Sequence, residues 1–303
     1  MQFLIPFVLL ILSSCEDNVV ESSNDELLFI ACEGNFGASN GSIEVFKNKE
    51  RVQTVENIGD IVQSLLVHED MLFVAINNSH KIKKYFITND GLSLPGIEVN
   101  TDNSSPREMC ILDGKLYFTN WNSKDIKVLD LYNYNLETFV SLQYVPEDIL
   151  TDGTYLWLTT PNIDLYDQNL GSKVLKFDSN SNILEIFEVG LGPEKLYLDE
   201  DMLYVSRTMY DQNWAPSYGS SVINISSGET TIINNYGAGA ACRSDIFKFN
   251  NNIHRATTQG AVPLDTELNL NMAAKVGDLN GVYSGKAFNN QLLLGSTDYS
   301  APD

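Results

Sequence analysis

The sequence predicts an all-β protein, a seven-bladed β-propeller. The first observation is a repeated three-residue signature: any residue, then an apolar one, then usually an aromatic one. Its central residue occurs seven times, 39 to 50 residues apart, at Leu28, Leu72, Leu116, Leu156, Leu203, Ile253 and Leu292. A period in the low forties with strand-like content is typical of propeller blades of four strands each. Alternating strands and regularly placed turns are the other two observations.

The strands are predicted from the alternation of apolar and polar residues, because successive side chains of a strand point to opposite faces. Residues 125–131 (DIKVLDL) and 173–178 (KVLKFD) alternate in this way. A turn precedes most copies of the signature, and Asp113-Gly114, for example, predicts a tight hairpin. The WD and GH dipeptides of WD40 repeats are missing from the sequence, which indicates a different class of propeller.

The charge of the chain restricts its partners. The 303 residues include 19 Lys and Arg against 40 Asp and Glu, a formal net charge of -21, and 43% of them are hydrophobic. This composition supports a large globular core, while the negative surface repels phosphate backbones, so we expect no nucleic-acid partner. After the N-terminus, no run approaches the roughly 20 apolar residues that a membrane-spanning helix needs.

Residues 1–14 predict a signal peptide, which is removed from the mature protein. The run from Phe3 to Leu12 is apolar, and Leu12-Ser13-Ser14-Cys15 resembles a bacterial lipobox. That motif implies a diacylglycerol attached to Cys15 through a thioether. An ordinary secretory signal that ends near a cysteine is the alternative interpretation.

Residues 15–26 predict an acidic, polar tether. Glu16 and Asp17 directly follow Cys15, a pattern that resembles the export signal of outer-surface lipoproteins in Bacteroidota. Each buried CH₂ of an acyl chain contributes about 0.8 kcal/mol, so several chains can hold a protein at a membrane. We therefore expect a cell-surface protein of the outer membrane whose lipid anchor is its only membrane contact.

The remaining cysteines predict no metal or cofactor site. Cys32, Cys110 and Cys242 lie in strand-like apolar segments, where we expect them to be small buried hydrophobic residues. No CxxC, HExxH or clustered Cys and His spacing occurs, so neither a metal nor a cofactor is predicted.

The predicted propeller covers residues 27–303, and its ends are expected to be incomplete. Counting ten residues back from each signature gives the start of the innermost strand, and the first count falls on Asn18, inside the tether. The first blade is therefore expected to lack an inner strand of its own. Only 11 residues follow Leu292, so the last blade is expected to be truncated, about 30 residues short of a full repeat.

Five segments carry a family resemblance: EGNFGASNGS (33–42), GDIVQS (59–64), NNSHKI (77–82), GPE (192–194) and STDYS (296–300). They resemble segments of the YncE-like surface propellers of Bacteroidota. The resemblance implies the propeller fold over nearly the whole mature chain. Some similar lipoproteins lie beside a TonB-dependent outer-membrane transporter and capture cobalamin. The resemblance therefore implies a small-molecule ligand, here a corrinoid, and a TonB-dependent transporter as partner.

Candidate ligand-binding residues lie where the loops of a propeller converge. Polar residues follow the starts of the innermost strands, namely Arg107, Glu147, Glu194 and the strand-start residue Arg243. Aromatic and amide residues occupy the loops between the second and third strands, namely Asn35, Phe36, Trp121, Tyr166, Tyr210, Trp214 and Tyr218. Aromatic planes beside amides suit a large, flat, partly polar ligand such as a corrin or a sugar ring. The alternatives are that the polar residues only solvate the channel mouth and that the aromatic residues only pack their own loops.

The sequence predicts no enzymatic activity. The three histidines, His68, His80 and His254, fall on different parts of the repeats and form no catalytic constellation. One alternative is a Ca²⁺-dependent lactonase-like hydrolase using Glu147, Asp148, Glu194 and Asp245. Another is a module that binds a protein at the cell surface and takes no small molecule.

Overall fold

The computed structural model describes residues 27–233, 235–239, 245–277, 281–288 and 290–295, and the backbone of two short segments, 10–11 and 17–20. The chain divides into two compact units, residues 1–141 and 142–303, which are described in turn. Within the described residues, no helix is long and apolar enough to cross a membrane.

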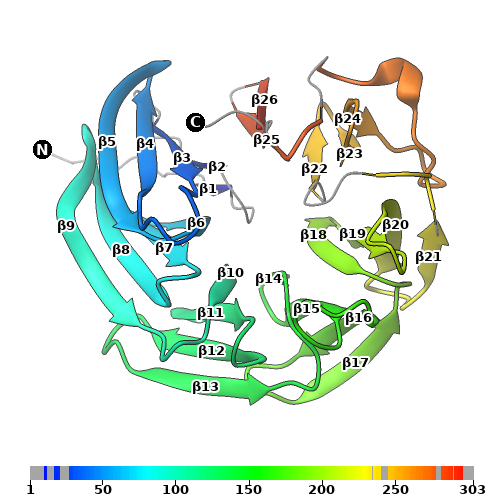
Figure 1. Ribbon diagram of the computed structural model, residues 1–303, viewed down its shortest axis with the longest axis horizontal. Coiled ribbons are helices and arrows are strands. Elements are labelled where there is room, and N and C mark those ends of the chain that lie inside the picture. Colours follow the sequence, from blue (N-terminus) through cyan, green and yellow to red (C-terminus); the bar gives the residue numbers. More distant parts are fainter. Residues whose placement is uncertain are drawn as a thin grey trace, which may run out of the picture. The chain divides into compact units, whose positions relative to one another are not determined.

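The first unit contains three antiparallel sheets whose strands follow one another in chain order (Figure 1). The first sheet consists of β1 (Leu10–Ile11), β2 (Asp17–Val20), β3 (Leu27–Cys32), β4 (Gly41–Lys47) and β5 (Glu50–Gly59). The second consists of β6 (Val62–His68), β7 (Met71–Ile76), β8 (Lys81–Thr88) and β9 (Gly91–Asn100). The third consists of β10 (Pro106–Leu112), β11 (Lys115–Asn120), β12 (Asp125–Asp130) and β13 (Leu136–Ser141).

The second unit contains four sheets of the same meander type. Two have four strands: β14 (Ile149–Thr151), β15 (Leu156–Asn162), β16 (Leu170–Phe177) and β17 (Ile183–Glu188), then β18 (Pro193–Asp199), β19 (Met202–Tyr210), β20 (Pro216–Asn224) and β21 (Thr230–Ile233). The next has three: β22 (Ile246–Phe249), β23 (Asn252–Thr257) and β24 (Gly260–Pro263), followed by the 3₁₀ helix η1 (Met272–Ala274). The last is the hairpin of β25 (Ser284–Phe288) and β26 (Gln291–Gly295).

The all-β propeller prediction is confirmed, but the predicted number of blades is wrong. Six sheets have three or more strands and count as blades, so the structure shows six blades rather than seven. The seventh signature, centred on Leu292, does form a strand, β26. Among the described residues, however, β26 pairs only with β25, and a blade needs further strands.

The first sheet also differs from the sequence prediction. The backbone of β2 pairs antiparallel with β3, with Asn18 opposite Phe29, so a strand lies where the first blade was expected to have none. Strand pairing satisfies the N–H and C=O groups along the edge of β3, which a polar segment can do as well as an apolar one. Cys15, the predicted lipidation site, lies outside the described residues, as does Cys242.

Packing between consecutive sheets of a unit forms the core. In the first unit, Phe29 and Ile43 pack with Leu65 and Val74 of the next sheet. In the second unit, Trp157 packs in the same way with Leu203. The second strand of a blade is covered on both faces, and for this reason the signature residues are apolar at successive positions.

The Asp113-Gly114 turn and the burial of Cys110 agree with the sequence predictions, whereas the exposure of Cys32 does not. Asp113 and Gly114 have φ values of 51° and 70°, as the predicted two-residue hairpin turn requires. Cys110 is buried as expected, whereas Cys32 is exposed because it is the last residue of β3, where the strand leaves the core.

The innermost strands begin with a recurrent hydrogen bond. The N–H of the residue that follows the predicted ring position donates to a hydroxyl of the second strand: Glu108 to Thr119 (3.0 Å), Asp148 to Thr159 (2.9 Å) and Lys195 to Ser206 (3.0 Å). Strand register shifts at this point in β10 and β18, as a β-bulge requires. The bulge fixes where the polar residues at the start of each inner strand lie.

Candidate functional site

The loop between β3 and β4 presents Phe36 to solvent, with 80% of the residue exposed. The backbone N–H of Gly37 donates to both carboxylate oxygens of Asp60, at 3.0 Å each. The N–H of Asn35 donates to Oδ1 of Asn40 at 2.8 Å. The loop is therefore held at two points while its aromatic residue stays outside the core.

Asp60 also connects this loop to the β7–β8 turn. Its carboxylate accepts a hydrogen bond from Nδ2 of Asn78, and its N–H donates to Oγ of Ser79 at 2.8 Å. Three of the segments that carry the family resemblance, 33–42, 59–64 and 77–82, thus meet in one hydrogen-bonded cluster. In this structure their shared role is to shape the loop around Phe36.

Arg107 and Trp121, both predicted site residues, are in contact. The guanidinium of Arg107 lies 3.9 Å from the ring centroid of Trp121, and Nη1 donates to Oε1 of Gln63. Both residues are half-buried. Stacking and the hydrogen bond fix the plane of the guanidinium, which is the geometry by which arginine recognises planar polar groups.

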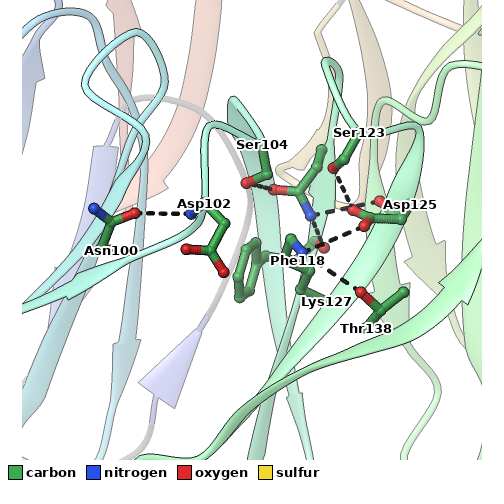
Figure 2. Close-up of polar contacts among 9 residues, drawn as sticks. Asn100, Asp102, Ser104, Phe118, Ser123, Asp125, Lys127 and Thr138 are labelled. Atoms are coloured by element: carbon green, nitrogen blue, oxygen red, sulfur yellow. Dashed lines mark hydrogen bonds and ion pairs between the residues drawn. The ribbon is translucent and has the colours of Figure 1, made fainter.

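The hairpin after Trp121 is held by a polar cluster on β12 (Figure 2). Oγ of Ser123 donates to Oδ1 of Asp125 at 2.6 Å, and Nζ of Lys127 lies 3.5 Å from Oδ2 of the same residue. Figure 2 also shows Lys127 directed toward Thr138 of the outer strand, at 3.5 Å. These bonds stabilise the start of β12, directly after the turn that contains Trp121.

His80 has a structural position. It lies in the tight β7–β8 turn with a φ of 53°, as the sequence predicts, and its Nδ1 accepts the N–H of Ser105 at 3.1 Å. Oγ of Ser105 lies 3.2 Å from the same nitrogen. Because the backbone N–H already donates to Nδ1, this nitrogen is poorly placed to take the proton of the Ser105 hydroxyl.

In the second unit, the inner-strand carboxylates accept backbone hydrogen bonds. Asp148 accepts the N–H of Ile149 (2.8 Å) and of Leu196 in the next sheet (2.7 Å). Asp245 accepts the N–H of Ile246 (2.8 Å) and of Gly285 (2.7 Å) in the same way. Both aspartates therefore join one inner strand to the next.

Burial raises the pKa of Asp245 to about 6, although the N–H donors of Gly285 and Ile246 act in the opposite direction. Desolvation of the charged carboxylate outweighs these donors.

The two predicted glutamates of this unit lie at neighbouring inner-strand starts. Glu147 is buried, and its N–H donates to the carbonyl of Thr159 at 3.1 Å. Oε2 of Glu194 accepts the hydroxyl of Thr208 at 3.0 Å. Among the described residues, no group of three or more His, Cys, Asp or Glu side chains has the arrangement of a metal site.

Two buried arginines were missed by the sequence reasoning. Arg207 of β19 and Arg255 of β23 are 1% and 0% exposed, and Nη2 of Arg255 donates to the carbonyl of Arg207 at 3.3 Å. Burial lowers the pKa of Arg207 to about 10, and the nearby charge of Arg255 acts in the same direction. Arg255 directly follows the signature, at a position that is apolar after the other six copies, and this was the available signal.

Two loops of the second unit are hydrogen-bonded to each other. Residues 163–169, between β15 and β16, and residues 211–215, between β19 and β20, are called the loop pair below. Nε2 of Gln168 donates to the carbonyls of Asp211 and Gln212, both at 3.1 Å. One side chain of the first loop therefore fixes the backbone of the second.

The loop pair displays two predicted aromatic residues. Tyr166 is 82% exposed and Trp214 is 53% exposed. Both have left-handed backbone conformations, with φ values of 58° and 61°, which bulky residues adopt only when the surrounding structure imposes them. Tyr210 packs against Trp214 with ring centroids 6.0 Å apart.

Each of these loops is stabilised by an aspartate. Oδ1 of Asp211 accepts the N–H groups of Asn213 (2.8 Å) and Ala215 (2.9 Å). Oδ1 of Asp167 accepts the N–H of Asn169 at 3.1 Å. Such turns hold an irregular loop in one conformation without a hydrophobic core of its own.

The predicted site residues therefore fall into separate groups. The first unit contributes Phe36 with Asn35, and Arg107 with Trp121. In the second unit, Tyr166 and Trp214 lie on the two loops of the loop pair and Tyr210 packs against Trp214, while Tyr218 packs against Tyr236 with centroids 5.3 Å apart. Arg243 lies outside the described residues.

The chain has an all-β propeller fold, as comparison with solved structures also shows. A proposed 6-phosphogluconolactonase from Bacteroides fragilis is 13% identical with a TM-score of 0.65, over 92% of this chain and 86% of that one. The Neurospora crassa Pan2 WD40 domain is 9% identical with a TM-score of 0.65, over 93% and 86%. BamB from Moraxella catarrhalis is 11% identical with a TM-score of 0.57, over 96% and 97%.

These structures differ in their described roles, so at such identities the similarity shows the fold alone. No protein-family model and no curated protein sequence matches the chain.

Proposed function

We propose that the protein is a non-catalytic ligand-binding propeller of the cell surface, anchored through a lipid at Cys15. It captures a small molecule for a TonB-dependent outer-membrane transporter. The observation that carries the binding role is the loop pair, in which the Gln168 amide joins two loops that each carry an exposed aromatic residue with a left-handed backbone conformation. The family resemblance of the sequence supplies cobalamin as the ligand to test.

The physical argument for binding is pre-organisation. Exposed aromatic side chains gain free energy when a ligand covers them, and a rigid loop loses little entropy on binding. Tyr166 and Trp214 are mostly exposed, and Asp167 and Asp211 hold the loops that carry them. A flat ligand with an apolar face can cover such planes.

The geometry gives the lactonase alternative little support. Both oxygens of Asp148 and of Asp245 accept backbone N–H groups that join inner strands. A Ca²⁺ site needs six to eight oxygen ligands directed at one point. Two of the four carboxylates that the alternative requires are thus engaged in joining inner strands.

Binding to a surface protein is a second candidate function, and Phe36 favours it. This residue is 80% exposed on a loop that Asp60 holds rigid. Exposed aromatic anchors on rigid loops are typical of binding hot spots between proteins.

Calorimetric titration of cyanocobalamin into the purified full chain tests the proposal. Submicromolar affinity that falls at least about tenfold, about 1.4 kcal/mol, in Trp214→Ala with Tyr166→Ala would support it. Tyr132→Ala is the matched control, because Tyr132 is an aromatic residue of the first unit that is 95% exposed. An absence of binding to a protein with an intact fold would overturn the cobalamin assignment.

A further inference from the structure

The loop pair is an anionic surface. Its twelve residues include Asp164, Asp167 and Asp211, and none is Lys, Arg or His. The chain as a whole has a net charge of -21, so the more distant field has the same sign. Any ligand that covers Tyr166 and Trp214 must approach these carboxylates.

Local hydrogen bonds keep at least one of these carboxylates ionised. Nδ2 of Asn169 donates to Oδ2 of Asp167 at 2.8 Å, and the N–H of the same residue donates to Oδ1. These donors stabilise the charged form and lower the pKa of Asp167. The negative charge of the loop therefore persists over the whole neutral and mildly acidic range.

The basic residues nearest in sequence to the loop pair do not offset this charge at the surface. Lys173, early in β16, has its Nζ 3.9 Å from Oε1 of Glu188 on the neighbouring strand. Arg207, before the second loop, is buried, with 1% exposure. The aromatic rings add a negative potential at their faces, which attracts cations and repels anions.

We propose that the loop pair selects ring-shaped ligands without a net negative charge, neutral or cationic, and rejects anionic ones. The ring lies on Tyr166 and Trp214, and its hydrogen-bond donors face the carboxylates, which can only accept. Asp164 is the selecting residue to test, because it is exposed and its loop is stabilised by Asp167. This inference rests on the proposed function, since it describes the ligand of the same site.

A pair of probes that differ by one charge tests the selection. The probes are cyanocobalamin and its derivative in which one peripheral amide is hydrolysed to a carboxylate, titrated into the full chain by calorimetry. At about 0.01 M ionic strength, where the Debye length is about 30 Å, we expect the anionic derivative to bind about tenfold more weakly. The difference should shrink at about 0.15 M, where that length is about 8 Å.

Variants that each remove one negative charge show which carboxylates cause the difference in affinity between the probes. Asp164→Asn should narrow the difference in affinity between the two probes, because the anionic derivative then meets one negative charge fewer. Glu229→Gln removes the same charge from the β20–β21 turn, at the opposite end of β20 from the loop pair, and should leave the difference unchanged.

The outcomes separate the two proposals. Equal affinities for the two probes, or an effect of Glu229→Gln as large as that of Asp164→Asn, would overturn the charge selection and leave ligand capture standing. Failure of both probes to bind the folded protein would overturn corrinoid capture together with the inference drawn from it.

Discussion

The carboxylate of Asp60 holds the backbone N–H of Gly37 across 23 residues of sequence, with both oxygens 3.0 Å from the nitrogen. Gly37 has a φ of 80°, a conformation that glycine adopts without steric cost. The bond bends the β3–β4 loop so that the adjacent Phe36 stays in solvent. A buried charge thereby determines the position of an exposed aromatic residue.

Replacing Asp60 with Asn should destabilise the first unit by about 1–3 kcal/mol, because an amide cannot accept hydrogen bonds at both of its terminal atoms. Urea unfolding followed by circular dichroism measures the loss. Asp90→Asn is the control, since the Asp90 side chain is 96% exposed and its ion pair with Lys47 is long, at 3.8 Å. Equal effects of the two substitutions would contradict the role of Asp60.

Replacing Gly192 with Ala should disturb both loops of the loop pair. Gly192 has a φ of 67°, and a Cβ atom there would lie 1.8 Å from the carbonyl oxygen of Thr208. The N–H of Gly192 also donates to the carbonyl of Gly171, at the base of the other loop. Steric overlap with backbone atoms must therefore shift β16 and β19, and ligand affinity should fall together with stability.

Gly153→Ala is the matched control for that substitution. Gly153 has a φ of 90°, but no atom lies within 4 Å of an added Cβ. The left-handed conformation alone costs roughly 1–2 kcal/mol, without a clash. A stability loss in Gly192→Ala no larger than in Gly153→Ala, measured by urea unfolding, would count against the close approach.

Local sequence patterns predicted much of the fold, because strands and hairpin turns depend on neighbouring residues. The signature residues Leu72, Leu116 and Leu156 are fully buried in second strands, as their spacing indicates. The number of blades was not predictable in the same way. It depends on whether β26 gains further strands, and pairing between strands is not encoded in the signature itself.

The candidate site was predictable as a set of loops but not as contacts. Loop length and aromatic content indicated Tyr166 and Trp214, and both are exposed on the loop pair. The bridge from Gln168 to the second loop depends on the packing of two sheets, which no local pattern reveals. Arg255 shows the opposite failure, because the position directly after the signature, apolar in the other copies, here holds a buried guanidinium whose hydrogen-bond partners the local pattern does not reveal.

Asp178, in the exposed β16–β17 turn, should contribute stability that disappears in acid. Its pKa is lowered by the side chain of Asn182 and by backbone N–H groups, so the folded state favours the carboxylate. This contribution is present above the ordinary pKa of 3.8 and is lost as the pH falls through the lower folded-state value. Asp178→Asn should therefore reduce the free energy of unfolding more at about pH 6 than at about pH 2. An equal reduction at both pH values would refute the stabilising role of the ionised Asp178 carboxylate.

Asp245 should have the opposite pH dependence. Burial raises its pKa from 3.8 to about 6 in the folded state, so the unfolded chain releases this proton at lower pH than the folded one. The free energy of unfolding should therefore fall as the pH rises from about 4 to about 6, and level off above that. Asp245→Asn cannot titrate and should lack this component. Urea unfolding of both proteins at several pH values measures the component as the difference in their free energies of unfolding. This difference should decrease as the pH rises to about 6. A difference that does not change with pH would show that burial does not perturb the ionisation of Asp245.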